Sequence, residues 1–225
     1  GGFTQYVLVP AYNIHHLPAN VDEISGSLSE PLTCCVHAFE QTHVEPGEIV
    51  VVSGPGAIGL LMAQVVKAAG AYTVVLGTTA DEARLALARE LGVDLTLDVQ
   101  AKDAQNTIEE LTDGLGADVV FECSGAAPSA QSCLELVRRR GRYGQVGLFG
   151  KPIQLDVDLI CFKELAVHGT FAHVPGAWRK ALALMSSGAV QTRPLVRDIL
   201  PISEWREAFA AFERRDGVKI VFQPQ

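Results

Sequence analysis

Three glycines stand at the spacing with which a polypeptide turn binds the pyrophosphate of a dinucleotide. From residue 51 to residue 59 the chain reads V-V-S-G-P-G-A-I-G, an apolar run followed by G-x-G-x-x-G and a helical pattern. Gly54 permits the tight turn, Gly56 lets the backbone approach a pyrophosphate, and Gly59 lets the helix pack against the strand. The start of the helix adds free N–H groups and the positive end of its dipole. We predict a dinucleotide site at this turn, made by Gly54, Gly56, Ala57, Ile58 and Gly59.

The end of the second expected strand bears on which cofactor would bind. About 20 residues beyond the glycines an Asp or Glu normally holds the adenosine ribose of NAD, but here the chain reads L-G-T-T from residue 76. Neutral Gly77 and Thr78 remove a charge that would repel a 2′-phosphate, and Arg84 is placed to reach one unless it is an ordinary solvated helix residue. Asp81 stands at a helix start, where capping is its expected role. We expect NADP or NAD, with a slight preference for NADP.

The ends of later strands supply further candidates, because ligands of doubly wound sheets lie beyond the carboxyl ends of the strands. The candidates there are Cys123, Ser124, Gly125, Val146 and Gly147. Ser124 lacks a G-x-S-x-G elbow and an evident His partner, so a cofactor-facing turn is favoured over a nucleophile. Lys219 could approach the pyrophosphate, with an ordinary charge beside a strand as the alternative.

Strand patterns alternate with helix patterns from residue 49 onward, which predicts a parallel sheet covered by helices, an α/β doubly wound (Rossmann) fold. The expected strands are 49–53, 73–76, 119–122, 142–147 and 165–169, with helices at 58–69, 81–92, 103–112 and 128–137 between them. Outside this alternation we expect a strand at 3–9, helices at 175–187 and 203–214, and strands at 194–200 and 219–222.

Composition excludes several other classes of protein. The hydrophobic fraction of 48% and the charged fraction of 20% are typical of a globular chain. A net charge of −8 argues against nucleic-acid and anionic-membrane partners, which are bound through clustered Lys and Arg. The five cysteines form no C-x-x-C pair, and no apolar run approaches the roughly 20 residues of a membrane helix. We expect a cytoplasmic protein.

With these motifs in place, the chain resembles the zinc-dependent medium-chain alcohol dehydrogenases, particularly the sorbitol and threonine dehydrogenase branch. The matching blocks are G-F-T-Q-Y-V from residue 2, E-P-L from residue 30 with H-A at 37, E-P-G-E from residue 45, and the glycine turn. The resemblance implies that residues 1–38 end a GroES-like catalytic domain, that 39–171 form the dinucleotide-binding domain, and that 172–225 pack back on the catalytic domain. Because the chain lacks an initial Met, we expect it to be a piece of a longer one.

The resemblance also implies a zinc ion in the intact enzyme and one metal-associated residue here. Catalytic zinc needs about three protein ligands, and the family's Cys and His-Glu pair would lie upstream of this chain. The position matching Glu30 is a metal ligand in this branch, directly or through water; its alternative is to cap a helix opening at Pro31. Cys34, Cys35 and His37 are disfavoured as a cluster, because sequence neighbours on a helix point apart. Gly169, Thr170 and Phe171 resemble the family strand whose backbone holds the nicotinamide carboxamide, which makes the nearby His173 the one histidine of interest.

The reaction that the resemblance implies is zinc-assisted hydride transfer between a secondary alcohol or polyol and NAD(P). We expect this chain to bind the cofactor, with little or no alcohol oxidation by itself. Two alternatives stay open: a zinc-free quinone-type reductase, against which the E-P-L block speaks, and a non-catalytic NAD(P)-binding module. The expected partners are a small-molecule substrate and other copies of the chain, in a homo-oligomer formed through an edge strand near residues 155–160.

Overall fold

A computed structural model describes residues 2–214 and 217–224, and its main feature is a parallel sheet with the strand order β3-β2-β1-β4-β5-β6. The strands are β1 (Ile49–Ser53), β2 (Tyr72–Gly77), β3 (Leu95–Asp98), β4 (Ala117–Glu122), β5 (Val137–Gln145) and β6 (Ala166–Gly169). Val52 of β1 pairs with Val75 of β2 on one side and with Phe121 of β4 on the other. The strand order reverses around β1, which confirms the predicted doubly wound fold and creates a crevice at the carboxyl end of β1.

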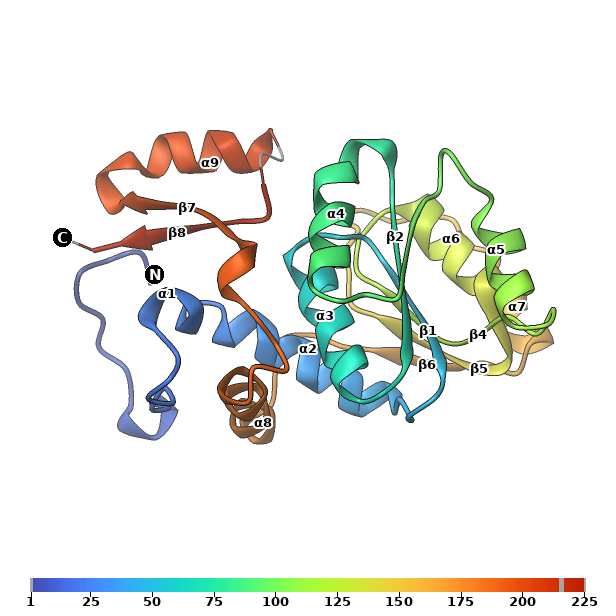
Figure 1. The fold of residues 1–225 in the computed structure, drawn as a ribbon, viewed down its shortest axis with the longest axis horizontal. Helices are drawn as coiled ribbons and strands as arrows, with labels where there is room; N and C mark the ends of the chain where they lie inside the picture. Colours follow the sequence, from blue (N-terminus) through green and yellow to red (C-terminus); the bar gives the residue numbers. More distant parts are fainter. Residues whose placement is uncertain (1, 215–216, 225) are drawn as a thin grey trace.

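Helices cover both faces of the sheet, and the central strands are therefore apolar on both sides (Figure 1). The helices around the sheet are α2 (Ser29–Thr42), α3 (Ala57–Ala68), α4 (Glu82–Glu90), α5 (Ala104–Leu111), α6 (Ala127–Leu136) and α7 (Asp158–Phe162). Val50 and Val52 pack into one core with α2, α3 and α4, whereas Val51 packs into a second core with α5 and α6. The alternation of Val side chains along β1 thus fills both layers.

A smaller unit flanks the sheet region, built from both ends of the described chain (Figure 1, left). Its elements are η1 (Ala11–Asn13), α1 (Glu23–Gly26), η3 (Arg193–Leu195), η4 (Ile202–Glu204), α9 (Trp205–Glu213) and the parallel pair β7 (Val196–Pro201) and β8 (Lys219–Gln223). Helix α8 (Pro175–Ser186) joins the two regions, because its Ala177, Ala181 and Met185 are buried in the same core as α2 and α3.

The structure corrects several expectations about the elements. Residues 3–9 form no strand: the segment is irregular and largely exposed, and Phe3 packs edge-to-face against Phe209 and Phe222 instead. An apolar run becomes a strand only where another strand accepts its backbone hydrogen bonds, and no described strand does so here. The expected edge strand near residues 155–160 is a loop that runs into α7, and β6 is the edge of the sheet on that side.

Other differences concern where elements begin and end. β3 was not expected, and β5 begins at Val137 rather than at residue 142, with an irregularity in its pairing to β4 between Ala117 and Val119. Helix α2 runs unbroken through residue 38, so the domain division expected there falls within a helix. No helix in the described ranges has both the length and the apolar character that crossing a bilayer requires.

Candidate functional site

The glycine turn has the shape that each glycine was expected to allow. Gly54 has a φ of +103°, and a methyl group on it would lie 2.7 Å from the Ser124 Cβ. A methyl group on Gly59 would collide with the Gly54 carbonyl oxygen, which explains why α3 can lie so close to β1. Gly56 is different, because a methyl group on it would meet no atom within 4 Å. Nothing in the described protein therefore excludes a side chain at Gly56, and the backbone there faces open space.

Gly56 is the N-cap of α3, and no side chain caps this helix end. The first N–H groups of a helix have no acceptor within the helix, so those that follow Gly56 are available to an anion at the positive end of the helix dipole. An open backbone face and an uncapped helix start are what a pyrophosphate needs. The turn therefore fits a dinucleotide.

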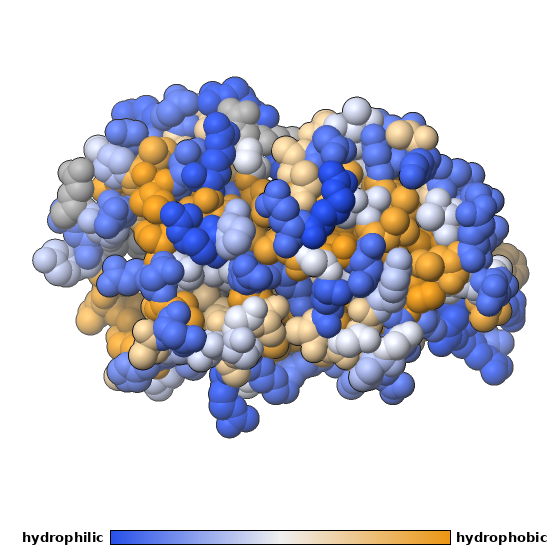
Figure 2. Space-filling model, in the orientation of Figure 1, coloured by the Kyte–Doolittle hydropathy of each residue, from blue (hydrophilic) through white to orange (hydrophobic). Residues whose placement is uncertain are grey.

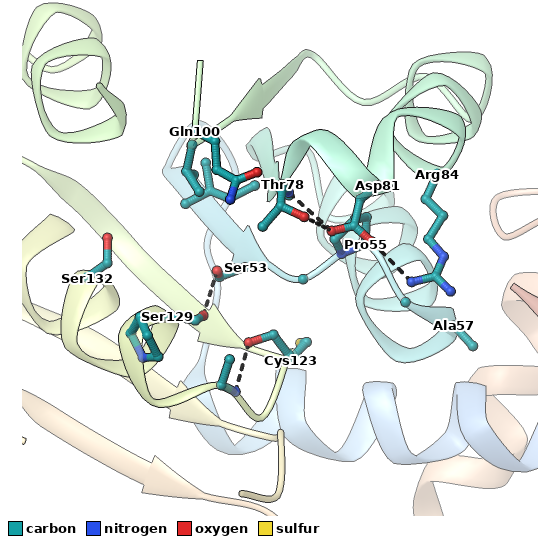
Figure 3. Close-up of a pocket in the computed structure, with 18 of the residues that line it drawn as sticks. Ser53, Pro55, Ala57, Thr78, Asp81, Arg84, Gln100, Cys123, Ser129 and Ser132 are labelled. Carbon is teal, nitrogen blue, oxygen red and sulfur yellow. Dashed lines mark hydrogen bonds and ion pairs between the residues drawn. The ribbon is translucent and has the colours of Figure 1, made fainter. Parts of the chain in front are cut away.

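A cleft of about 1200 Å³ opens over this turn. Of the predicted cofactor residues it is lined by Gly54, Gly56, Ala57, Gly77, Thr78, Arg84, Cys123 and Ser124, and Lys219 lines the opposite wall. In Figure 3, Ser53 lies between Thr78 and Asp81 on one side and Ser129 on the other. The cleft also takes in Val99 and Gln100 after β3, which sequence reasoning missed together with that four-residue strand.

The remaining predicted residues lie outside the cleft lining. Gly59 is buried in α3 and Ile58 is partly buried against the core, whereas Gly125, Val146 and Gly147 lie behind Ser124. Gly169 ends β6, and Thr170 and Phe171 follow it; the Thr170 N–H donates to the Gln145 carbonyl at 3.0 Å, and Phe171 is exposed. The structure thus brings together the turns after β1, β2 and β4 and leaves the end of β6 apart from them.

One end of the cleft is built around Arg84. The Asp81 carboxylate accepts from the Thr78 N–H at 3.1 Å and from the Thr78 hydroxyl at 2.8 Å, so Asp81 caps the turn η2 (Thr79–Asp81) rather than α4. The Arg84 guanidinium lies 3.1 Å from Asp81 and donates to the Gly217 carbonyl at 2.9 Å. With only 19% of its side chain exposed, Arg84 is not the solvated helix residue of the alternative interpretation. It connects the sheet region to the flanking unit.

A buried carboxylate that sequence reasoning missed lies behind the Ser124 turn. Glu122, the last residue of β4, is fully buried and accepts from the Ser124 N–H at 2.9 Å, the Ser129 hydroxyl at 2.9 Å and the Gln145 side-chain amide at 2.8 Å. The only sequence signal for it is an ionisable residue that ends an apolar strand just before a Cys-Ser-Gly turn. Sequence reasoning treated it as part of the strand.

Glu30 lies on the first turn of α2, away from the cleft. Its Oε1 is 3.7 Å from the His173 Nε2 and accepts from the Cys34 thiol at 3.4 Å. The helix begins at Ser29, so Glu30 does not cap a helix that opens at Pro31. Within the described ranges no three His, Cys, Asp or Glu side chains could hold a metal ion together. Glu30 alone does not make a zinc site, and the described residues group fewer than three potential ligands at any one place.

The two cysteines near Glu30 carry protonated thiols; Cys34 is half-buried and Cys35 belongs to the core. Burial, with a smaller contribution from Glu30, raises the pKa of the Cys34 thiol to about 12. Cys35 is fully buried, and its thiol lies 3.4 Å from the Ile58 carbonyl oxygen. Burial raises the pKa of this thiol as well. Neither is poised as a thiolate nucleophile.

Known proteins with similar sequences include dehydrogenases of sorbitol and of D-arabitol phosphate. The chain is 43% identical over 225 residues to a sorbitol dehydrogenase of Halalkalibacterium halodurans, covering all of this chain and 66% of that protein. It is 36% identical to a D-arabitol-phosphate dehydrogenase of Enterococcus avium, covering 99% of this chain and 64% of that protein. The chain therefore spans slightly less than two thirds of the length of these relatives.

Solved structures agree with the sequence relatives. A zinc-binding dehydrogenase of Sinorhizobium meliloti 1021 bound to NADP superimposes with a TM-score of 0.88 at 29% identity, covering all of this chain and 66% of that one. L-idonate 5-dehydrogenase of Escherichia coli gives a TM-score of 0.82 at 30% identity, covering 92% and 58%. The sequence model described as zinc-binding dehydrogenase matches residues 57–187 of the 225. These matches confirm the resemblance: the chain belongs to the zinc-binding dehydrogenase family, in its sorbitol dehydrogenase-like branch.

Proposed function

We propose that this chain is the cofactor-binding part of a zinc-dependent alcohol or polyol dehydrogenase, which transfers hydride between a secondary alcohol or polyol and a nicotinamide cofactor. The observation that carries the proposal is the turn at Gly56, whose open backbone face and uncapped helix lie at the base of a cleft large enough for a dinucleotide. The names of the relatives supply the substrate class. Residues 1–38, 39–171 and 172–225 keep their proposed assignments to the end of the catalytic domain, the nucleotide domain and the returning segment.

Within this proposal the α3 N-terminus and the backbone at Gly56 bind the pyrophosphate, and Lys219 approaches it from the opposite wall. Cys123 and Ser124 lie along the path toward the nicotinamide, and Gly169, Thr170 and Phe171 hold the carboxamide. A zinc ion bound in the full-length enzyme would supply Lewis-acid chemistry at the alcohol oxygen. Glu30 is the one residue that we assign to the metal.

Replacing Gly56 by Ala tests cofactor binding with little risk to the fold. The new methyl group meets no protein atom within 4 Å, but it points where the pyrophosphate would lie. In a fluorescence titration we expect NADPH to bind Gly56→Ala at least about tenfold more weakly than the unaltered chain, which corresponds to ~1.4 kcal/mol, at an unchanged Tm. Gly176→Ala in α8, also without a neighbour within 4 Å, is the matched control. Equal NADPH binding by all three proteins would contradict the proposal.

We further propose that NADP is preferred over NAD. Neutral Gly77 and Thr78 and the partly buried guanidinium of Arg84 at the same end of the cleft support this preference. A charge-assisted hydrogen bond is worth about 1.5–3 kcal/mol, so Arg84→Gln should weaken NADPH binding by about ten- to a hundredfold and leave NADH binding nearly unchanged. NADH bound at least as tightly as NADPH by the unaltered chain would refute the preference.

The activity itself requires the full-length protein. We expect NADP-dependent oxidation of polyols, lost on zinc chelation and restored by zinc, whereas the present chain alone should turn over little or no alcohol. Reduction of quinones by a full-length protein without zinc would favour the reductase alternative, and cofactor binding without any turnover would favour the non-catalytic module. We also propose a cytoplasmic homo-oligomer, for which light scattering and cell fractionation are the tests.

A further inference from the structure

We propose that Glu122 is a positioning residue for the cofactor, whose buried carboxylate holds the turns after β1, β4 and β5 in one arrangement. The inference rests on the proposed function for the cofactor and goes beyond it by naming a residue that need not touch the cofactor.

The turn after β4 is wrapped around this carboxylate. Oε1 of Glu122 accepts from the Ser124 N–H at 2.9 Å and from the Ser124 hydroxyl at 2.5 Å. The Gly125 N–H points between the two oxygens, at 3.2 Å from Oε1 and 3.1 Å from Oε2. Gly125 has a φ of +66°, a conformation that favours glycine. The backbone that presents Ser124 to the cleft is therefore folded around Glu122.

The turn after β5 is fastened to the same group. The Gln145 side-chain amide donates to Glu122 Oε2 at 2.8 Å and to the Gly147 carbonyl at 2.7 Å. The Gly147 N–H donates to the Glu122 carbonyl at 2.8 Å, and a methyl group on Gly147 would lie 2.5 Å from Oε2. The two turns thus leave no space between them for a side chain at Gly147, and a shift of one would displace the other.

A third connection reaches the glycine turn after β1. The Ser129 hydroxyl donates to Glu122 Oε1 at 2.9 Å and lies 2.8 Å from the Ser53 hydroxyl, a pair that is visible in Figure 3. Ser53 directly precedes Gly54, and Gly54 has no room for a methyl group beside Ser124. The cradle for the pyrophosphate and the turn toward the nicotinamide therefore share one anchor.

The anchor has to be a carboxylate. Its two oxygens face two N–H groups, two hydroxyls and one amide NH₂, and a carboxylate accepts all of them without offering a donor. An amide of the same shape would turn a donor toward other donors. Among the residues that the structure describes, no Lys, Arg or His forms an ion pair with Glu122, so hydrogen bonds alone stabilise it. The negative charge of Glu122 also acts on a neighbouring thiol. Burial, and to a smaller extent the charge of Glu122, raises the pKa of the Cys133 thiol to about 12.

The sign of the effect on cofactor affinity tests the proposal. NADPH is an anion, so removing a nearby negative charge should by electrostatics alone tighten its binding. If Glu122 positions the turns, Glu122→Gln instead weakens NADPH binding, by about tenfold or more in a fluorescence titration of this chain. Glu135→Gln is the charge control: Glu135 faces the same cleft, but its side chain accepts a hydrogen bond from Gln131 of its own helix. We expect this variant to bind NADPH as tightly as, or more tightly than, the unaltered chain.

A second measurement separates positioning from general loss of stability. By amide hydrogen exchange, Ser124 and Gly125 should lose protection in Glu122→Gln, while the amides of β1 keep theirs. If Glu122→Gln does not fold, Ser124→Ala and Ser129→Ala each remove one hydroxyl donor and should weaken NADPH binding by severalfold at a nearly unchanged Tm. Unchanged or tighter NADPH binding with unchanged exchange at Ser124 and Gly125 would overturn the inference. Failure of the unaltered chain to bind NADPH would instead refute the proposed function.

Discussion

The sheet region and the flanking unit are built with very different amounts of buried apolar surface. In the sheet region the strand β1 has Val50, Val51 and Val52 fully buried between two helical layers. In the flanking unit, a two-stranded sheet carries one helix, and Phe3, Tyr6 and Phe212 are 67%, 90% and 71% exposed. Figure 2 shows that apolar residues reach the surface in both regions. Since a two-stranded sheet is marginally stable by itself, we infer that the sheet region supplies most of the stability and holds the flanking unit in place through α8.

The largest expected effect tests this difference with one residue type. Phe121 is fully buried near the carboxyl end of β4, and Phe121→Ala should lower the free energy of unfolding by about 3–5 kcal/mol, through lost burial and the cavity left behind. Phe3→Ala in the flanking unit should lower it by less than ~1 kcal/mol, because the ring is mostly exposed and contributes mainly through its edge-to-face contacts. Urea unfolding of both variants measures the contrast. Similar losses in the two would show that the flanking unit is as integral to the fold as the sheet.

A second prediction concerns close packing within the sheet region. Gly59→Ala forces α3 away from β1, because the new methyl group collides with the Gly54 carbonyl. Overpacking of this kind costs about 1–3 kcal/mol, and NADPH binding should be lost with the displaced helix. Thermal unfolding measures the loss of stability, and the fluorescence titration with NADPH measures the loss of cofactor affinity. Gly56→Ala is the internal comparison, because it should lose NADPH affinity at an unchanged Tm.

A third prediction concerns the end of α6. The Lys163 ammonium donates to the carbonyl oxygens of Leu134, Glu135 and Val137, which an α-helix C-terminus otherwise leaves without partners. Lys163→Met should lower the free energy of unfolding by about 1.5–3 kcal/mol, since hydrogen bonds to charged groups are worth that much. Lys151→Met, at an exposed position, should change it by less than ~0.5 kcal/mol. Equal losses of unfolding free energy in the two variants, measured by urea unfolding, would show that Lys163 does not stabilise the end of α6.

A further prediction concerns the dependence of stability on pH. The pKa values of Cys34 and Cys133 are about 12 in the folded chain against an ordinary value of 9.0, mainly because burial disfavours the thiolate. For an acid whose folded pKa is raised, the stabilisation is complete below the ordinary pKa and declines as pH rises above it. Stability should therefore fall as the pH rises from 9 toward 12, and exposed Cys161 should react with iodoacetamide well before Cys34 or Cys133. Early alkylation of Cys133 would mean that the sheet core opens more readily than its burial indicates.

Local sequence signals sufficed where the feature is itself local. The glycine turn, β1, β2 and the helices α3, α4 and α8 were predicted nearly to their ends, because glycine spacing and apolar periodicity are read within one element. The strand β3 was not predicted from the sequence, because its four residues are too few to show a periodic pattern. The strand predicted at residues 3–9 was wrong for the opposite reason. These residues have a strand pattern, but a strand also needs a neighbouring strand, which no local pattern reveals.

The sequence by itself determined the fold class, the dinucleotide turn at Gly54, Gly56 and Gly59, and the absence of an acid after Leu76. Only the tertiary structure decided that Arg84 contacts Gly217, that Glu30 lies beside His173, and that Glu122 ties three turns together. The physical reason is the distance along the chain between the partners. A contact such as that of Glu122 with Gln145 depends on the register of whole strands, and that register is set only when the helices pack on the sheet.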